Sequence, residues 1–103
     1  MFHVVKPSIS VKEKTVLTGP KKIARLSCTI SASPLASVTW NVNGKPVDER
    51  PNMQQESRYD SPKFALGSTL TVQDVSKRDL GQYSCYATNK YGNATGYINV
   101  TGW

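Results

Sequence analysis

Hydrophobic and polar residues alternate in short segments along the whole chain. The clearest segment spans residues 24–30, where alanine, leucine, cysteine and isoleucine occupy every second position and polar residues lie between them. Shorter segments with the same period lie at 9–11, 38–42, 70–72, 83–87 and 94–100. A period of two places alternate side chains on opposite faces of a strand, and nowhere do apolar residues keep helical spacing for more than about one turn. The pattern predicts an all-β fold.

Turn-forming residues separate these segments. Asn43-Gly44 is the dipeptide most typical of a two-residue β-hairpin, and Gly19-Pro20 and Ser33-Pro34 also interrupt the alternation. Residues 76–79 predict a connecting turn or a single helical turn. Residues 9–17 predict one continuous first strand, whereas the polar segment 48–61 predicts edge strands and loops.

Length and composition are those of one small globular domain. The chain has 103 residues, of which 38% are hydrophobic and 19% charged. Its longest apolar runs are far shorter than the roughly 20 residues that span a bilayer, so we expect no membrane insertion. Residues 7–101 are expected to form the domain, with 1–6 as an N-terminal extension or linker and 102–103 as a C-terminal linker.

Cys28 and Cys85 are the only cysteines of the chain. Two cysteines this far apart lack the paired spacing of a zinc site, and both occupy inward positions of their alternating segments. A disulfide is therefore the better interpretation, and it favours an oxidising compartment. In the loop-entropy account such a bridge adds about 4 kcal/mol to the free energy of unfolding.

The second cysteine lies within a longer motif, DLGQYSCYATNKYG at residues 79–92. Together with Cys28, with Trp40 inward on an intervening segment and with Leu70, this motif resembles the I-set subfamily of the immunoglobulin superfamily. The resemblance implies an immunoglobulin-like β-sandwich of two antiparallel sheets, joined by a Cys28–Cys85 disulfide that packs against the Trp40 indole.

The resemblance also implies a task for individual residues of the motif. Gly81 permits a tight corner, and Tyr83 returns its hydroxyl to the chain as a tyrosine corner. Gly92 is expected to supply the positive φ of the last hairpin.

Asp79, at the start of the motif, is expected to pair with an arginine near the fourth strand. Arg58 is the first candidate and Arg50 is the alternative. Both arginines lie within or beside the polar segment whose strand register stays open, so the sequence does not decide between them.

No catalytic constellation accompanies these motifs. His3 is the single histidine, and we expect it to be a solvated residue of the N-terminal extension. The carboxylates lack the calcium-loop pattern, no base accompanies the serines, and the glycines lie singly at turns instead of forming a phosphate-binding loop. We expect a non-enzymatic domain without a metal or cofactor.

Three tyrosines are candidate partner-binding residues. Strand alternation places Tyr86 and Tyr97 on the outward face of the sheet that carries the tryptophan, and Tyr91 lies at the tip of the last hairpin. Tyrosine is enriched at protein interfaces. The alternative is that these side chains only cover the sheet.

Two N-x-T sequons begin at Asn93 and Asn99. Both asparagines have the outward parity of the last strand, so both are N-glycosylation candidates if the chain is secreted. Sugar at both positions would cover part of the Tyr97 face and would compete with partner binding there.

The chain carries a formal net charge of +6, which predicts attraction to acidic surfaces. Five cations are expected to gather at the end that holds the C-terminus: Lys21, Lys22, Lys45, Lys77 and Arg78. Such a patch would bind an acidic protein or heparan sulfate through charge; the alternative is ordinary solvated side chains or contacts to a neighbouring domain. No aromatic residues interleave the cations, so we expect no nucleic-acid binding.

The resemblance implies an extracellular binding or adhesion module of a cell-surface receptor or adhesion glycoprotein. Such a module acts by homophilic or heterophilic protein contact and has immunoglobulin or fibronectin-type domains as neighbours. The alternatives are an intracellular muscle or cytoskeletal spacer domain, and a heparan-sulfate-binding module. The expected disulfide and the outward sequons favour the extracellular interpretation.

Overall fold

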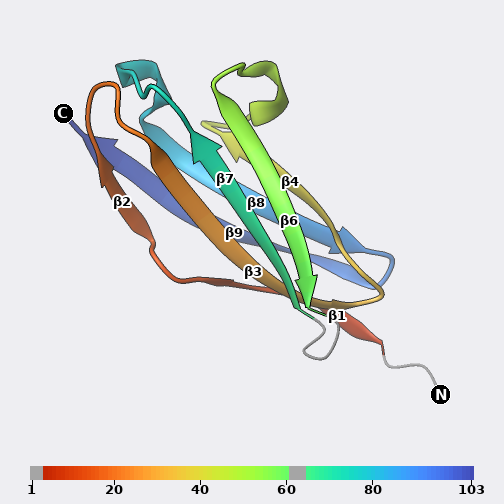
Figure 1. The fold of residues 1–103 in the computed structure, drawn as a ribbon. Helices are drawn as coiled ribbons and strands as arrows, with labels where there is room; N and C mark the ends of the chain where they lie inside the picture. Colours follow the sequence, from red (N-terminus) through yellow and green to blue (C-terminus); the bar gives the residue numbers. More distant parts are fainter. Residues whose placement is uncertain (1–3, 61–64) are drawn as a thin grey trace.

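The computed structural model describes residues 4–60 and 65–103, which form two β-sheets packed face to face (Figure 1). The elements in chain order are β1 Val5–Val11, β2 Thr15–Thr18, β3 Ala24–Ser33, β4 Ser37–Val42, β5 Lys45–Pro46, the 3-10 turn η1 Val47–Glu49, β6 Met53–Asp60, β7 Ala65–Val72, the 3-10 turn η3 Lys77–Asp79, β8 Gly81–Asn89 and β9 Gly92–Gly102. One sheet has the strand order β1-β3-β7-β6 and the other β2-β9-β8-β4-β5. The predicted all-β sandwich of two sheets is confirmed. His3 lies outside the described residues.

The segment expected to form one first strand forms two strands in different sheets, so that prediction was wrong. β1 pairs with β3 in antiparallel fashion, whereas β2 pairs with β9 in parallel. The chain crosses between the sheets at residues 12–14, which read Lys-Glu-Lys and are all exposed. Three consecutive charged side chains cannot enter a buried ladder without losing their hydration, so the first strand ends there.

The polar segment after residue 48 forms η1 and then β6. β6 is an outer strand that pairs only with β7, as expected for an edge. Only Met53 of this strand reaches the core, and its remaining residues are exposed. The expected single turn before β8 is η3.

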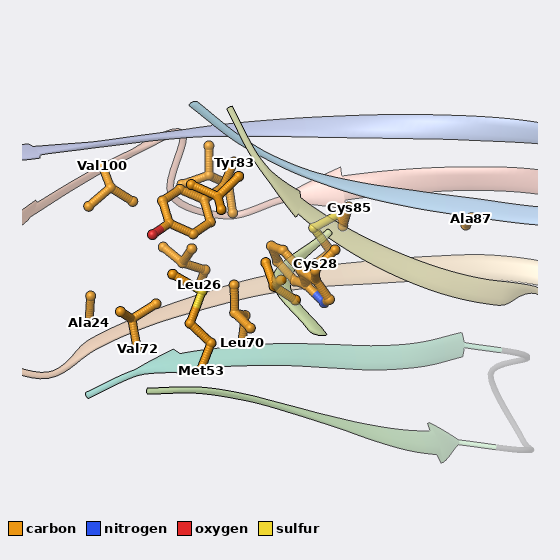
Figure 2. Close-up of a cluster of buried hydrophobic side chains, with 14 of the residues drawn as sticks. Ala24, Leu26, Cys28, Met53, Leu70, Val72, Tyr83, Cys85, Ala87 and Val100 are labelled. Atoms are coloured by element: carbon orange, nitrogen blue, oxygen red, sulfur yellow. A yellow bond between two sulfur atoms is a disulfide. The ribbon is translucent and has the colours of Figure 1, made fainter. Parts of the chain in front are cut away.

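The core lies between the sheets and contains the Cys28–Cys85 disulfide (Figure 2). Trp40 is fully buried and lies opposite Cys85 in the β4–β8 ladder. Its Nε1 donates a hydrogen bond of 2.8 Å to Oγ of Ser68 on β7, which joins the two sheets. The indole thereby gives the hydroxyl of Ser68, 1% exposed, the partner that a buried polar group requires.

The β4–β5 hairpin turns on Asn43 and Gly44, whose φ values are 49° and 82°. Positive φ at both positions defines the type I′ turn expected for this dipeptide. Asn43 also holds the neighbouring chain, because its side-chain amide donates to the carbonyl of Leu80 and accepts from the backbone N–H of Gln82. A Cβ at Gly81, where φ is 135°, would collide with Asn43, so the corner before β8 requires glycine.

The role expected for Gly92 was wrong. Positive φ occurs at none of residues 90–92. Instead, Oδ1 of Asn89 accepts a hydrogen bond of 2.9 Å from the backbone N–H of Tyr91. This Asx turn carries the chain round the last hairpin without a left-handed residue at position 92.

Candidate interaction surfaces

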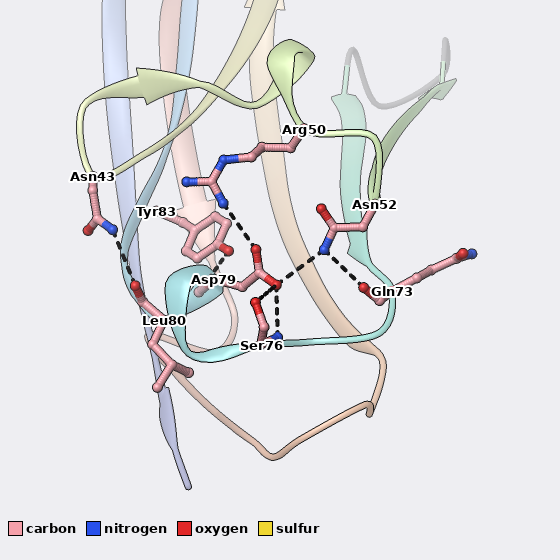
Figure 3. Close-up of polar contacts among 8 residues, drawn as sticks. All are labelled: Asn43, Arg50, Asn52, Gln73, Ser76, Asp79, Leu80 and Tyr83. Carbon is pink, nitrogen blue, oxygen red and sulfur yellow. Dashed lines mark hydrogen bonds and ion pairs between the residues drawn. The ribbon is translucent and has the colours of Figure 1, made fainter.

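A polar cluster surrounds the buried Asp79 at the end of the sandwich that carries η1 and η3 (Figure 3). The Asp79 side chain is 1% exposed, and its Oδ1 accepts a hydrogen bond of 3.1 Å from Nη1 of Arg50. Its Oδ2 accepts from Nδ2 of Asn52 at 3.2 Å, and from the backbone N–H and the Oγ of Ser76 at 2.9 and 3.2 Å. Four donors therefore satisfy the carboxylate, which acts as part of the framework and is not available as a general base.

The structure identifies Arg50, and not Arg58, as the partner of Asp79. The first candidate from the sequence was wrong and the alternative is confirmed. The reason is the direction of β6: Met53 at its start lies opposite Val72, close to η3, whereas Arg58 lies opposite Gly67 farther along β7. An arginine just before β6 can reach Asp79, and one on its second half cannot.

Tyr83 forms the expected tyrosine corner. Its hydroxyl donates a hydrogen bond of 2.6 Å to the backbone carbonyl of Asp79, four residues upstream. Burial, reinforced by the Asp79 carboxylate, raises the pKa of Tyr83 well above its usual range. The phenol therefore stays protonated as a donor, and Tyr83 contributes to stability instead of reactivity.

The outward face of the five-stranded sheet carries two of the candidate tyrosines. Tyr97 on β9 lies opposite Ser84 and is 56% exposed, whereas Tyr86 on β8 lies opposite Thr95 and is half-buried. The two rings are thus diagonal neighbours on one face. The sequence parity placed both tyrosines on the outward side, and the structure agrees.

Leu17 on β2 belongs to the same face and was not singled out from the sequence. It lies opposite Thr101 of β9, and it is the most exposed large hydrophobic residue of the described chain at 79%. Its neighbour Val16 faces the core, so Leu17 must point outward. Only the splitting of the first strand between the two sheets places Leu17 beside β9, which is why the sequence alone did not reveal it. We call Leu17, Tyr86 and Tyr97 the apolar face.

Tyr91 lies apart from this face. It occupies the β8–β9 hairpin, at the end of the sandwich opposite the C-terminus (Figure 1). Nζ of Lys90 lies 5.3 Å from the centre of its ring, within the range of a cation–π contact. The Tyr91 ring is therefore partly covered by Lys90, and Tyr91 does not extend the apolar face.

Both sequon asparagines are exposed on β9. Asn93 lies opposite Thr88 near the hairpin, and Asn99 lies opposite Gln82. Side chains at 93, 95, 97 and 99 share one side of the strand, so the two sequons flank Tyr97.

The five predicted cations are all exposed: Lys21, Lys22, Lys45, Lys77 and Arg78. Two backbone hydrogen bonds, from Lys21 N–H to the Val75 carbonyl and from Val75 N–H to the Lys22 carbonyl, hold the β2–β3 turn beside the loop before η3. Figure 1 shows both loops at the end that carries the C-terminus. Asp74 lies in the loop before η3, whereas Asp48 and Glu49 lie on η1 at the same end, and all three are exposed, so cations and anions are mixed at this end.

Within residues 4–60 and 65–103 no three His, Cys, Asp or Glu side chains gather as a metal site. The same part of the chain contains no helix long and apolar enough to cross a membrane.

The immunoglobulin I-set domain profile matches residues 7–101 of this chain. The chain belongs to the immunoglobulin I-set family. Among curated relatives of this I-set domain, the muscle M-line assembly protein unc-89 of Caenorhabditis elegans is 36% identical over 92 residues, which cover 87% of this chain and 1% of that protein. Human neural cell adhesion molecule L1 is 33% identical over 91 residues, which cover 86% of this chain and 7% of L1.

Solved structures show the same fold. The complex of Dpr2 Ig1-Ig2 with DIP-Theta Ig1-Ig3 contains a chain that superposes with a TM-score of 0.90 at 22% identity, covering 97% of this I-set domain and 33% of that chain. The domain thus spans a small part of the proteins that it resembles, and these include both adhesion and muscle proteins.

Proposed function

We propose that this I-set domain is a protein-binding module of a secreted or cell-surface protein, and that the apolar face is its contact surface. The observation that carries the proposal is the exposure of Leu17 and Tyr97 on one regular sheet face. Burial of exposed leucine and tyrosine side chains against a partner lowers the free energy of the complex, and tyrosine is also enriched among the residues that dominate binding energy. Threonine, serine and asparagine side chains lie between and around these two residues, and they would supply the hydrogen bonds of the interface.

The extracellular setting is supported by two features of the chain. The only two cysteines form a buried disulfide, which persists in oxidising compartments. Both sequon asparagines are exposed, and we propose Asn93 and Asn99 as N-glycosylation sites. A glycan on Asn99 would lie between Leu17 and Tyr97, so occupancy of this site would limit the contact surface. The similarity to unc-89 leaves a muscle spacer domain as the rival function.

The experiment is a binding screen with the domain secreted from animal cells and displayed as a multimer. Multimers of the wild type are applied to cells that each express one membrane protein. The proposal expects that membrane proteins bound by the wild type are no longer bound by the Leu17→Ser or the Tyr97→Ala multimer. The Arg25→Ala multimer should still bind them, because exposed Arg25 lies on the outward face of the other sheet. Hits that survive both apolar-face substitutions but disappear with Arg25→Ala would overturn it. Intact mass before and after reduction, and after removal of N-glycans, tests the extracellular setting separately.

The basic end supports a second candidate function, binding of heparan sulfate. Its support is the backbone pairing that holds the loops of Lys21, Lys22 and Lys77 together. The exposed carboxylates at the same end weaken the positive field, so this candidate ranks below protein binding. Elution from a heparin column below roughly physiological salt, or elution unchanged by alanine at Lys21, Lys22, Lys77 and Arg78, would exclude it.

A further inference from the structure

The outer strands of the two sheets differ in how they are protected against pairing with another chain. β1 contains Pro7 and a shift of register between Val5 and Ser8. β2 has four residues, and β5 has two and contains Pro46. Short length, proline and irregular register are three means by which an edge is blunted, and charged side chains, which β6 carries at Glu56, Arg58 and Asp60, are a fourth. In the described part of the chain, β6 has none of the first three means: it pairs with β7 over eight consecutive residues without a shift and contains no proline.

The charges on β6 are arranged so that they would complement those of a second β6 paired with it in antiparallel fashion. Glu56 and Arg58 lie on the outward face, on either side of Ser57, and both are exposed. Within the part of the chain that the structure describes, neither of them forms an ion pair. Arg58 lies opposite Gly67, which has no side chain, and a shallow hollow of about 400 Å³ lies between Glu56, Arg58 and Thr69.

We propose that β6 is a self-association edge, which pairs in antiparallel fashion with β6 of a second copy about a two-fold axis at Ser57. In this register Glu56 of each copy lies opposite Arg58 of the other, and Gln54 lies opposite Asp60. Opposite charges directly across a strand pair stabilise it. The two four-stranded sheets would then continue as one eight-stranded sheet, with main-chain hydrogen bonds across the junction.

The neighbouring registers are disfavoured. A shift by one residue would place outward side chains opposite inward ones, which the alternation of a strand forbids. A shift by two residues in one direction places Glu56 opposite its own copy, and in the other direction it places Arg58 opposite its own copy. Like charges directly opposite are destabilising, so the charge pattern selects the register centred on Ser57. This edge belongs to the sheet that does not carry the apolar face, so the inference does not depend on the proposed function.

The test is sedimentation of the purified 103-residue chain over concentrations up to about 1 mM, since a contact of one strand pair is expected to be weak. The wild type should form a concentration-dependent dimer that weakens in 1 M salt because salt screens the two charge pairs. Glu56→Arg alone should weaken dimerisation roughly tenfold or more, because it places like charges opposite each other at both pairs. Arg58→Glu alone should do the same, and the double substitution E56R/R58E should restore the wild-type affinity.

A mixture supplies the sharpest control. The E56R chain presents cations at both positions and the R58E chain presents carboxylates at both, so the two chains mixed should form a heterodimer although each alone is monomeric. Arg25→Glu, an exposed charge reversal on the central strand β3 of the same sheet, should leave dimerisation unchanged. A wild type that stays monomeric at 1 mM, or a dimer that survives E56R and R58E alone, would overturn the proposal. Unchanged thermal unfolding of each variant shows that the loss is not a loss of fold.

Discussion

Removal of the Asp79 carboxylate should be among the most destabilising single substitutions on the polar framework. Asp79→Ala removes an acceptor that is 1% exposed and that satisfies Arg50, Asn52 and Ser76. Breaking a buried ion pair from one side costs about 3–5 kcal/mol. The Arg50 side chain is 22% exposed and can turn toward water, and Asn52 keeps its hydrogen bond to the Gln73 carbonyl, so we expect the lower end, about 3 kcal/mol.

The matched pair of arginines makes this prediction specific. Arg50→Ala should cost about 2 kcal/mol, because the buried Asp79 carboxylate loses the charged one of its four hydrogen-bond donors. Arg58→Ala should stay within about 0.5 kcal/mol, as for other exposed positions. A double-mutant cycle by urea denaturation should give a coupling of about 1–3 kcal/mol between Arg50 and Asp79, and none between Arg58 and Asp79. Equal costs for the two arginines, or coupling of Asp79 to Arg58, would refute the reasoning.

Three further predictions concern the core. Above about pH 10 the tyrosines of the unfolded chain ionise, whereas the raised pKa of Tyr83 keeps its phenol protonated in the folded state. The free energy of unfolding should therefore fall by about 1.4 kcal/mol per pH unit above pH 10. Tyr83→Phe should remove that part of the slope in urea titrations and cost about 1 kcal/mol at neutral pH; an unchanged slope would contradict this. Gly96→Ala should cost about 1–3 kcal/mol, because its Cβ would lie 2.8 Å from methyl groups of Ile9 and Val11. Gly67→Ala is the control and should be nearly neutral, because the nearest atom to its Cβ would lie at 3.8 Å. Reduction of the Cys28–Cys85 disulfide should cost about 4 kcal/mol in denaturant titrations, and a loss below about 1 kcal/mol would contradict its assigned role.

Much of the fold could be predicted from the sequence because its determinants are local. Alternation over residues 24–30 and 83–87 identifies two strands, and Asn43-Gly44 identifies its own hairpin. The motif that starts at Asp79 carries a corner whose hydrogen bond, from Tyr83, spans only four residues. Such features depend on neighbours in the sequence, so they could be found without coordinates.

The features that could not be predicted depend on segments far apart in the chain. Arg50 and Arg58 are both arginines in or beside the same polar segment, and only the direction of β6 shows which of them reaches Asp79. The hydrogen bond from Trp40 to Ser68 joins strands in different sheets. Leu17 becomes part of the apolar face only because the chain leaves the first sheet at residues 12–14 and pairs with β9.

The measurement that tests the central claim most directly is the affinity of this I-set domain for a partner found in the screen. Titrations would compare the wild type with Tyr97→Ala, with Leu17→Ser and with Tyr91→Ala as a tyrosine outside the apolar face. The account predicts that the first two substitutions each weaken binding by roughly tenfold or more, as expected for anchors of an interface. It predicts that Tyr91→Ala leaves the affinity within about threefold of wild type. A loss of binding with Tyr91→Ala, together with wild-type affinity of the Tyr97 and Leu17 variants, would contradict the account.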